Sequence, residues 1–365
     1  MKRLLIAAGG GGDPITAAIV HAALHGADTP ALVLTYAWER LVVDPVPGPR
    51  RAPDFTGTEP AAPGLALITP ATTPRAPAGS LLPRLSGALR PRLGLLDPYG
   101  GTLGLARQIA AAARWCRADR IDLVDVGGDI VARGDEPTLR SPLGDALAVA
   151  ACAETGLPTT VYVAGPGLDN EVPLLDLLPR LGAPALTLDA AHTESVSRVF
   201  DWHPSEASAL LVAAARGVRG VCGTRDAPRP VLLDDTARQV HRLTLERVLA
   251  LSPLARALAG CSSLEHAEAV SRAVCGFSEI ARERRRAANA APPAPHRPDR
   301  TPAALLDRFA AWERDTLAQG IAYATTRRIT EELDLTATET DTLLAGLRTA
   351  GPERHVPPLW RLATG

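Results

Sequence analysis

Short apolar segments alternate with longer amphipathic or alanine-rich segments over the first 200 residues. The apolar segments, which predict buried strands, are 4–8, 31–35, 65–68, 93–96, 121–126, 160–164 and 185–188. The segments that predict helices are 15–24, 102–116, 142–154, 172–181 and 193–199. Because strands separated by helices pair in parallel through right-handed crossovers, we expect an α/β fold with an open, mostly parallel, Rossmann-like sheet flanked by helices.

The second half of the chain predicts helices and a separate small unit. Between about 205 and 286 the pattern is mainly helical, with one strand-like segment at 230–233. We therefore expect an α/β ligand-binding domain over 1–288 and a Pro- and Arg-rich linker over 289–300. A small helical C-terminal extension over 301–365 should follow.

The C-terminal extension has a pattern that is compatible with two functions. Segments 325–333 and 338–347 match the two helices of a helix-turn-helix, and 356–362 is wing-like. However, the extension has seven arginines against nine acidic residues, a net charge of −2. A protein that reads duplex DNA needs a basic face. We therefore expect a packing or oligomerisation unit, with a DNA-binding regulator as the alternative.

Two proline-rich segments, 44–63 and 69–83, interrupt the alternation after predicted strands. Loops of this length inside compact domains are often lids or substrate-facing covers. As covers, both segments would stand over the strand ends and exclude water from a ligand. Tolerated surface insertion is the alternative.

The composition narrows the classes of function. Hydrophobic residues make up 46% and charged residues 22% of the chain, as in ordinary globular proteins. The net charge of −1 gives no electrostatic case for nucleic acid or an anionic membrane. No uncharged apolar stretch approaches the roughly 18 residues of a membrane span. Five widely spaced cysteines indicate reduced thiols rather than a zinc site, and we expect a cytoplasmic protein.

Lysine is nearly absent. Lys2 is the only one, and all the other residues in the Lys and Arg total of 39 are arginines. Lys2 precedes the first predicted strand. The chain therefore lacks a suitable lysine for an imine with a carbonyl substrate or pyridoxal phosphate. It also lacks a Gly-Lys-Ser/Thr phosphate-binding loop. Neither mechanistic class fits this sequence.

Loops that combine glycine with acidic residues follow four of the predicted strands. Their candidate ligand-binding residues are Gly9, Gly10, Gly11, Gly12 and Asp13, then Asp97, Gly100 and Gly101, then Asp125, Gly127, Gly128 and Asp129, and finally Asp169, Asn170 and Glu171. In a parallel sheet such loops gather at one edge, where ligands bind. Glycine allows the backbone to approach a ligand, and helix N-termini attract anions. The pattern predicts a polar small-molecule site.

The first of these loops fits no standard nucleotide fingerprint. After Gly12 the sequence Asp13-Pro14 is a good helix start, with Asp13 as the N-cap, and the third glycine of a Gly-x-Gly-x-x-Gly motif is missing. A helix cap thus explains Asp13 by itself. Four consecutive glycines exceed what a tight turn needs, which favours contact between this loop and a ligand.

Asp125 and Asp129 are the strongest candidates for chemistry. Asp125 lies at the end of an apolar strand, where an unpaired carboxylate is costly, and Asp129 follows across two glycines. Together they could hold a divalent cation, of which Mg²⁺ is the one we consider, or a pair of ligand hydroxyls. The alternative is a turn stabilised by aspartate side chains.

Other polar residues near predicted strand ends have supporting roles in this hypothesis. Arg140 and Ser141 precede a helix with Asp145 in its first turn, and Arg140 could neutralise a phosphate or pair with a nearby acid. Glu39, after the second strand, could bind ribose hydroxyls. His192 is the best-placed histidine, and it or Glu171 would move a proton.

Three motifs together resemble a known family. They are Gly9-Gly10-Gly11-Gly12-Asp13, the segment from Trp38-Glu39-Arg40 to Asp44-Pro45-Val46-Pro47-Gly48-Pro49-Arg50, and Asp125-Val126-Gly127-Gly128-Asp129. They resemble the uncharacterised archaeal and actinobacterial family of domain of unknown function 1152. The resemblance covers about residues 1 to 280 and implies one long α/β domain. It implies no substrate.

The leading hypothesis is an enzyme that acts on a nucleotide, ribosyl or phosphorylated small molecule by group transfer or hydrolysis. The alternative is a non-catalytic ligand-sensing or assembly subunit whose C-terminal helices contact a partner. In either case we expect a small-molecule ligand, and neither nucleic acid nor a membrane, as the partner. Self-association into a homo-oligomer is left open.

Overall fold

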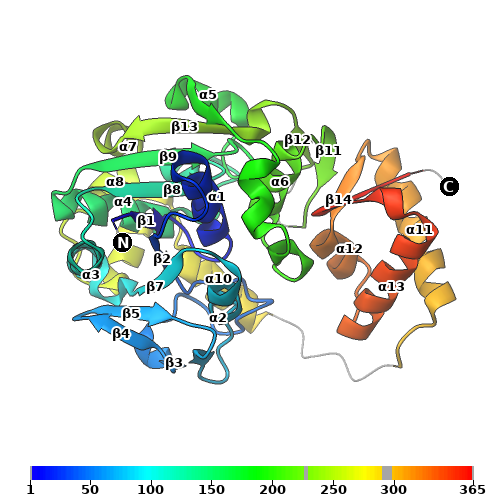
Figure 1. Cartoon of the computed structure of the whole chain (residues 1–365), viewed down its shortest axis with the longest axis horizontal. Coiled ribbons are helices and arrows are strands. Elements are labelled where there is room, and N and C mark those ends of the chain that lie inside the picture. The colour runs from blue at the N-terminus through cyan, green and yellow to red at the C-terminus, as the bar shows by residue number, and fades with distance from the viewer. Residues whose placement is uncertain (1, 226–228, 290–297, 364–365) are drawn as a thin grey trace.

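A computed structural model describes residues 2–225, 229–289 and 298–363 of the chain. The linker predicted over 289–300 falls mostly on residues 290–297, which lie outside the described residues. Figure 1 shows a large α/β domain built on one sheet, with the C-terminal unit beside α6 (Glu206–Ala215), β11 (Gly220–Gly223) and β12 (Val231–Leu233).

The α/β domain is built on a mixed, mostly parallel sheet of nine strands. In spatial order these are β10 (Pro184–Thr187), β13 (Gln239–Thr244), β9 (Thr159–Ala164), β8 (Ile121–Val126), β1 (Leu4–Ala7), β2 (Leu32–Tyr36), β7 (Arg92–Leu96), β5 (Leu65–Ile68) and β4 (Glu59–Ala62). The five central strands from β9 to β7 pair in parallel. At the two sides β13 and β5 pair antiparallel with their neighbours, so the predicted parallel centre is confirmed and the edges differ.

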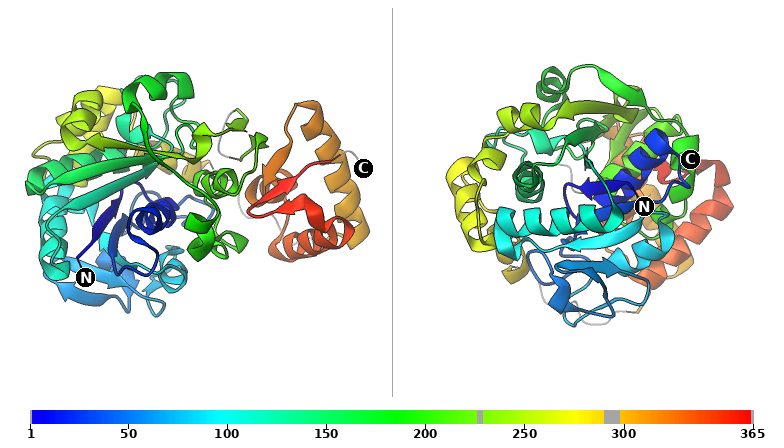
Figure 2. Two further views of the ribbon diagram at one scale, coloured as in Figure 1. Left: turned by 45° about the horizontal axis from the view of Figure 1, so that its top comes forward. Right: turned by 60° about the vertical axis from the view of Figure 1, so that its left-hand side comes forward.

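Helices cover both faces of this sheet (Figure 2). One face is covered by α3 (Gly101–Cys116), α4 (Pro142–Thr155), α7 (Leu245–Leu251), α8 (Pro253–Ala257) and α9 (Leu264–Cys275). The other is covered by α1 (Asp13–His25), α2 (Leu82–Ala88) and α6. Side chains alternate along β1, so that Leu4 and Ile6 join the first core while Leu5 and Ala7 join the second. Burial on both faces explains why the central strands are continuously apolar.

Several predicted elements differ from the structure. The segment 205–286 is less helical than expected, because β11 and β13 occur in it beside the expected strand at 230–233. β13 reads Gln-Val-His-Arg-Leu-Thr and is too polar to stand out as a strand without the sheet that it joins. The helix predicted at 193–199 is replaced by 3₁₀ turns at Ala191–Val196 and Val199–Asp201.

The proline-rich segments become structured parts of the domain rather than long free loops. The first contains β4, which extends the edge of the main sheet. Two further strands, β3 (Phe55–Thr56) and β6 (Thr73–Pro74), join the two segments into a small two-stranded sheet. The stretch that directly follows β2 lies at the strand ends: Val42 and Val43 contribute to cavities described below.

The C-terminal unit has its own core and contains both helices and strands. Its elements are α11 (Pro302–Ala318), β14 (Tyr323–Thr325), α12 (Thr326–Glu332), α13 (Ala337–Ala350), β15 (His355–Val356) and β16 (Leu359–Arg361). The helices predicted at 325–333 and 338–347 are thus confirmed as α12 and α13, and the wing-like segment is the β15–β16 hairpin. Buried side chains from all three helices and from β16, including Phe309, Ile329, Leu343 and Trp360, form the core.

The C-terminal unit is joined to the α/β domain through a shared sheet. β14 pairs in parallel with β11, so that β12, β11, β14, β16 and β15 form one five-stranded sheet. The backbone hydrogen bonds across this pair fix the orientation of α12, which begins directly after β14. None of the helices within the described residues is both long and apolar enough to cross a membrane.

The four glycine–acid loops follow β1, β7, β8 and β9, which are all parallel strands. They therefore lie at one edge of the main sheet, as expected. The strands are not immediate neighbours, however, because β2 stands between β1 and β7. The loop after β7 is thereby separated from the other three by the loop after β2.

Candidate functional site

A cavity of about 470 Å³ opens at the edge where the parallel strands end. Loops after β1, β2, β8 and β9 form its walls together with the start of α4 and with α10 (Glu279–Ala288). The predicted site residues that line it are Gly9, Gly10, Gly11, Gly12, Asp13, Glu39, Asp125, Asp129, Arg140, Ser141, Asp169 and Glu171. Residues from five separate segments of the chain therefore meet in one place.

Three aspartates converge in this cavity. Asp13 is the first residue of α1, Asp125 lies near the end of β8, and Asp145 lies in the first turn of α4. One carboxylate oxygen from each lies within 4.8 Å of the others, a spacing that can hold a metal ion. Asp129, predicted as a ligand with Asp125, lines the same cavity but is not one of these three. Asp145 had no predicted role beyond its place in a helix's first turn.

Two of these carboxylates have oxygen atoms that lack partners. Asp125 Oδ2 and Asp145 Oδ1 are buried without a hydrogen-bond partner among the described residues. The two residues are only 1% and 4% exposed, respectively. A buried charged oxygen without a partner costs several kcal/mol, so each such atom needs a proton or a cation.

Burial and mutual repulsion change the protonation of the whole cluster. Burial, followed by the charge of neighbouring carboxylates, raises the pKa of Asp125, Asp129 and Asp145 well above the usual range. Burial also raises the pKa of Asp13 and of Asp169 to about 7. Like charges at such short separations cannot all be present in a low-dielectric site. Without a cation the cluster therefore retains protons near neutral pH.

The glycine loop after β1 is required by packing within the protein. A Cβ atom at Gly9 would overlap the carboxylate of Asp13, which accepts a hydrogen bond from the Gly9 backbone N–H at 2.6 Å. A Cβ atom at Gly10 or Gly12 would overlap Trp38 or Ser205. The expected N-cap role of Asp13 is wrong, because Gly12 is the N-cap and makes no side-chain cap. The Asp13 carboxylate faces the loop instead.

A glycine in the loop after β8 leaves room for the carboxylate of Asp169. Gly127 has φ +111°, and a Cβ atom there would overlap the carboxylate of Asp169. Asp169 Oδ1 accepts from the Glu171 backbone N–H, while its Oδ2 is buried without a partner among the described residues. The glycine thus permits an acid from the neighbouring loop to lie beside the end of β8.

Glu171 and Arg140 are occupied by contacts that hold the site together. The Glu171 carboxylate accepts from the backbone N–H groups of Arg140 and Ser141 and from Ser141 Oγ. Arg140 lies 3.5 Å from the same carboxylate and donates to the Asp169 carbonyl oxygen. These bonds fix the start of α4, and thereby Asp145, relative to the loop after β9.

Helix α10 forms a further wall of the cavity. Glu283 accepts from Trp38 Nε1 at 3.0 Å and from the Gly48 backbone N–H at 2.7 Å, and Glu279 accepts from the Leu143 N–H. Burial raises the pKa of both glutamates. Their polar contacts with loops more than 100 residues away could not be inferred from a helical pattern.

Arginines surround the acidic interior. Arg40, Arg225 and Arg286 line the cavity and are exposed, whereas Asp125 and Asp145 are buried and Asp13 is half-buried. Arg327, from the C-terminal unit, also reaches its wall. The site therefore has an acidic interior, which suits a cation, and a basic mouth, which suits an anion.

Some predicted site residues do not line this cavity. They are Asp97, Gly100, Gly101, Gly127, Gly128, Asn170 and His192. Asp97 accepts from the Tyr99 backbone N–H, and a Cβ atom at Gly101 would overlap the backbone around Cys261, so the loop after β7 serves packing. Asn170 donates to the Arg229 carbonyl oxygen, and His192 pairs with Asp189. Glu39 lines the cavity but accepts from Ser80 and Leu81.

These features define an α/β protein with a buried acidic cluster at the carboxyl ends of its parallel strands. The sequence model of the family described as "Protein of unknown function (DUF1152)" matches residues 4–287, and the chain belongs to this family. The matched region contains the whole aspartate cluster and ends before the C-terminal unit. Comparisons with curated proteins and with solved structures gave no significant match.

The raised carboxyl pKa values predict how stability depends on pH in the absence of metal. A carboxyl whose pKa is higher in the folded than in the unfolded protein stabilises the fold at low pH, and this contribution is lost as the pH rises. Asp125→Asn removes the ionisable carboxyl group but keeps nearly the same side-chain shape. We expect the variant to exceed the wild type in unfolding free energy by roughly 1–3 kcal/mol at pH 8, and by little at pH 4.

Denaturant unfolding in EDTA at several pH values measures this difference. Asp122→Asn is the matched control, because Asp122 lies on the same strand but pairs with His25 at the other end of it. The control should show no gain that grows with pH. A constant difference between wild type and Asp125→Asn from pH 4 to pH 8 would contradict the electrostatic description of the cluster.

Proposed function

We propose that the chain is an enzyme that binds a divalent cation, Mg²⁺, between Asp13, Asp125 and Asp145. With it, the enzyme would bind a nucleotide, ribosyl or phosphorylated small molecule and act on it by group transfer or hydrolysis. The observation that carries the proposal is the pair of buried oxygens without partners among the described residues, Asp125 Oδ2 and Asp145 Oδ1, within one three-aspartate cluster.

The chemistry of the cluster favours a hard cation. All three candidate ligands are carboxylates, and Mg²⁺ and Ca²⁺ prefer oxygen ligands, whereas zinc sites use histidine and cysteine. A cation here would neutralise carboxylates that otherwise retain protons. Bound to a phosphate, such an ion neutralises the charge that develops in phosphoryl transfer or hydrolysis.

The surroundings of the cluster favour an anionic ligand group. The 13-residue helix α1 and the 14-residue helix α4 both begin at the cavity, and N-terminal backbone N–H groups attract phosphates. The exposed Arg40 and Arg286 stand at the same cavity. A metal–phosphate unit would satisfy the acidic interior and the basic mouth together.

The order of the strands supports a Rossmann-like site. The five parallel strands have the spatial order β7-β2-β1-β8-β9, which in chain order is 3-2-1-4-5. This is the order of the first five strands of the dinucleotide-binding sheet. In that sheet the ligand lies where the strand order reverses, here between β1 and β8, whose following loops supply Asp13 and surround Asp125.

Asp129 is the best candidate for proton transfer in this proposal. It is 8% exposed, lines the cavity without being one of the three proposed ligands, and burial raises its pKa, which favours the protonated form that a general acid needs. The Glu171 carboxylate already accepts hydrogen bonds from the backbone at the start of α4, and His192 lies outside the cavity. Neither residue is therefore given a proton-transfer role.

A non-catalytic ligand sensor is the second candidate. The observation that favours it is that Arg327 and Glu331, from α12, line the same cavity as the aspartates. A ligand in the cavity could therefore alter contacts of the C-terminal unit without being converted. The two candidate functions differ only in whether the bound ligand is converted into a product.

Binding of Mn²⁺, a paramagnetic substitute for Mg²⁺, tests the cation site directly. We expect electron paramagnetic resonance to show one tightly bound Mn²⁺ in the wild type, and Asp145→Asn to weaken binding at least about tenfold because a ligand oxygen is lost. Asp97→Asn is the matched control: Asp97 lies at the same sheet edge, outside the cavity, and should leave Mn²⁺ binding unchanged. Equal affinity in wild type and Asp145→Asn would refute the assignment.

Turnover separates the enzyme from the sensor. The wild type with Mg²⁺ should convert at least one member of a panel of nucleotides and sugar phosphates into a product of new mass. Asp129→Asn should lower that rate by about 10²-fold or more, since general acid catalysis contributes on this scale. Ligands that raise the melting temperature but stay unchanged by mass spectrometry would favour the sensor.

A further inference from the structure

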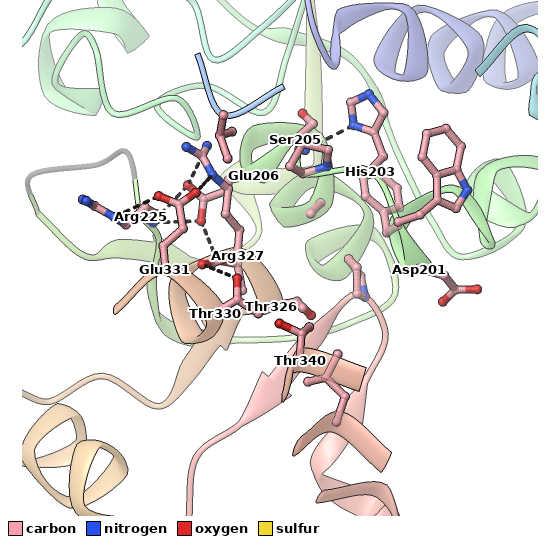
Figure 3. Close-up of a pocket in the computed structure, with 18 of the residues that line it drawn as sticks. Asp201, His203, Ser205, Glu206, Arg225, Thr326, Arg327, Thr330, Glu331 and Thr340 are labelled. Carbon is pink, nitrogen blue, oxygen red and sulfur yellow. Dashed lines mark hydrogen bonds and ion pairs between the residues drawn. The ribbon is translucent and has the colours of Figure 1, made fainter. Parts of the chain in front are cut away.

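A second cavity, of about 710 Å³, lies between the α/β domain and the C-terminal unit. Its walls come from the segment after β2, from the segment 200–206 before and at the start of α6, and from α12 and α13. Figure 3 shows His203 and Ser205 of the α/β domain and Thr326, Thr330 and Thr340 of the C-terminal unit around it.

This second cavity adjoins the aspartate site. Val42, His203, Arg225 and Arg327 line both cavities, so the two share part of their walls. A single ligand of moderate length could therefore occupy both. Small-molecule sites commonly combine a compartment that holds charged groups with a larger one that is mainly apolar.

The wall contributed by the C-terminal unit is fixed to the α/β domain by buried polar contacts. Thr325 Oγ1 donates to the carboxylate of Glu206, which also accepts from the Arg225 backbone N–H. Arg327 Nη1 lies 3.9 Å from Glu206, and Arg225 Nε lies 3.2 Å from Glu331 (Figure 3). Together with the β11–β14 pair, these contacts hold α12 against the α/β domain and so define this wall of the cavity.

The chemistry of the second cavity differs from that of the aspartate site. Phe200, Leu335 and Leu344 supply apolar surface, and threonine hydroxyls supply hydrogen-bonding groups. Arg225 and Arg327 of its lining pair with Glu331 and Glu206, and acidic residues such as Asp341 are exposed there, so the lining gives no net attraction for an anion. The cavity therefore suits an uncharged, partly apolar ring that can form hydrogen bonds.

His203, a residue of the shared wall, has a buried hydrogen-bond donor that no described residue accepts. It is 6% exposed, and its Nδ1 accepts from the Ser205 backbone N–H at 3.2 Å, so the ring hydrogen lies on Nε2. Nε2 has no partner among the described residues. Burial, together with the charge of Arg40, lowers the pKa of His203 to about 4, so the ring is neutral. A buried N–H without a partner calls for an acceptor.

We infer that the second cavity is the base compartment of the ligand site. It would take the uncharged aromatic base of a nucleoside phosphate whose phosphate groups lie at the aspartate cluster. His203 would donate its Nε2 hydrogen to an acceptor atom of the base. The inference rests on the proposed function and specifies its substrate class. It also assigns recognition of the base partly to α12 and α13, which lie beyond the region that matches the family.

Calorimetry with matched ligands tests this assignment. In the presence of Mg²⁺, the wild type should bind at least one of ADP, GDP, CDP and UDP about tenfold or more tightly than pyrophosphate, which has the same diphosphate but no base. Thr340→Trp fills the cavity from α13 and should abolish this preference while leaving pyrophosphate affinity within about twofold. His203→Phe removes the donor and should reduce the preference about tenfold.

Two control variants separate these effects from general damage. Thr349→Trp places the same bulk on an exposed position of α13 outside the cavity, and His266→Phe makes the same histidine change at an exposed position of α9. Both should keep the wild-type preference. Retained pyrophosphate binding shows that each cavity variant is folded.

The outcomes that overturn the inference differ from those that overturn the proposed function. If pyrophosphate binds with Mg²⁺ as tightly as every nucleoside diphosphate, the base compartment is refuted and the cation–phosphate site stands. The base compartment is likewise refuted, and the cation–phosphate site unaffected, if Thr340→Trp leaves the preference intact. If neither pyrophosphate nor any nucleoside diphosphate binds, the proposed phosphorylated ligand is refuted, and the base compartment falls with it.

Discussion

Burial of like-charged carboxylates at the end of a parallel sheet is the constraint on which the rest of this structure depends. Asp13, Asp125 and Asp145 come from three different elements and are brought within a few ångströms of one another. Such a cluster opposes folding unless protons or a cation neutralise it. The surrounding protein supports it with rigid contacts: Glu171 fixes the start of α4, Gly127 admits Asp169, and the glycine loop packs against Trp38 and Ser205. A fold keeps an unfavourable arrangement of this kind where a function requires it.

The central part of the fold could be predicted from the sequence because its signals are local and strong. Segments such as 121–126 and 160–164 are short and largely apolar, and the glycine-rich loops that mark their ends favour buried strands over helices. The edges could not be predicted in the same way. β13 is a polar six-residue strand that is stabilised by pairing with β9 and β10, and such tertiary pairing leaves no mark on its own sequence.

The residues of the candidate site that lie at strand ends could be predicted from the sequence, and the others could not. Asp13, Asp125 and Asp129 lie within or directly beside the glycine–acid loops, so topology brings them together. Asp145 lies one turn inside an alanine-rich helix, where a single acid looks like an ordinary response to the helix dipole. His203 follows no strand of the main sheet, and it lies in the cavity wall just before α6, whose Ser208 donates to the Gly12 carbonyl oxygen in the loop after β1. His192, which is better placed in the sequence, pairs with Asp189 instead.

The central claim is that the three aspartates form a cation site, and crystallography of the full chain with Mn²⁺ tests it most directly. Anomalous scattering at the manganese edge should show one strong peak bounded by carboxylate oxygens of Asp13, Asp125 and Asp145, at about 2.1–2.3 Å from its ligands. Asp125 Oδ2 and Asp145 Oδ1 should be among them. A structure at millimolar Mn²⁺ with no peak in the cluster, and with the carboxylates hydrogen-bonded to one another as protonated pairs, would contradict the cation site.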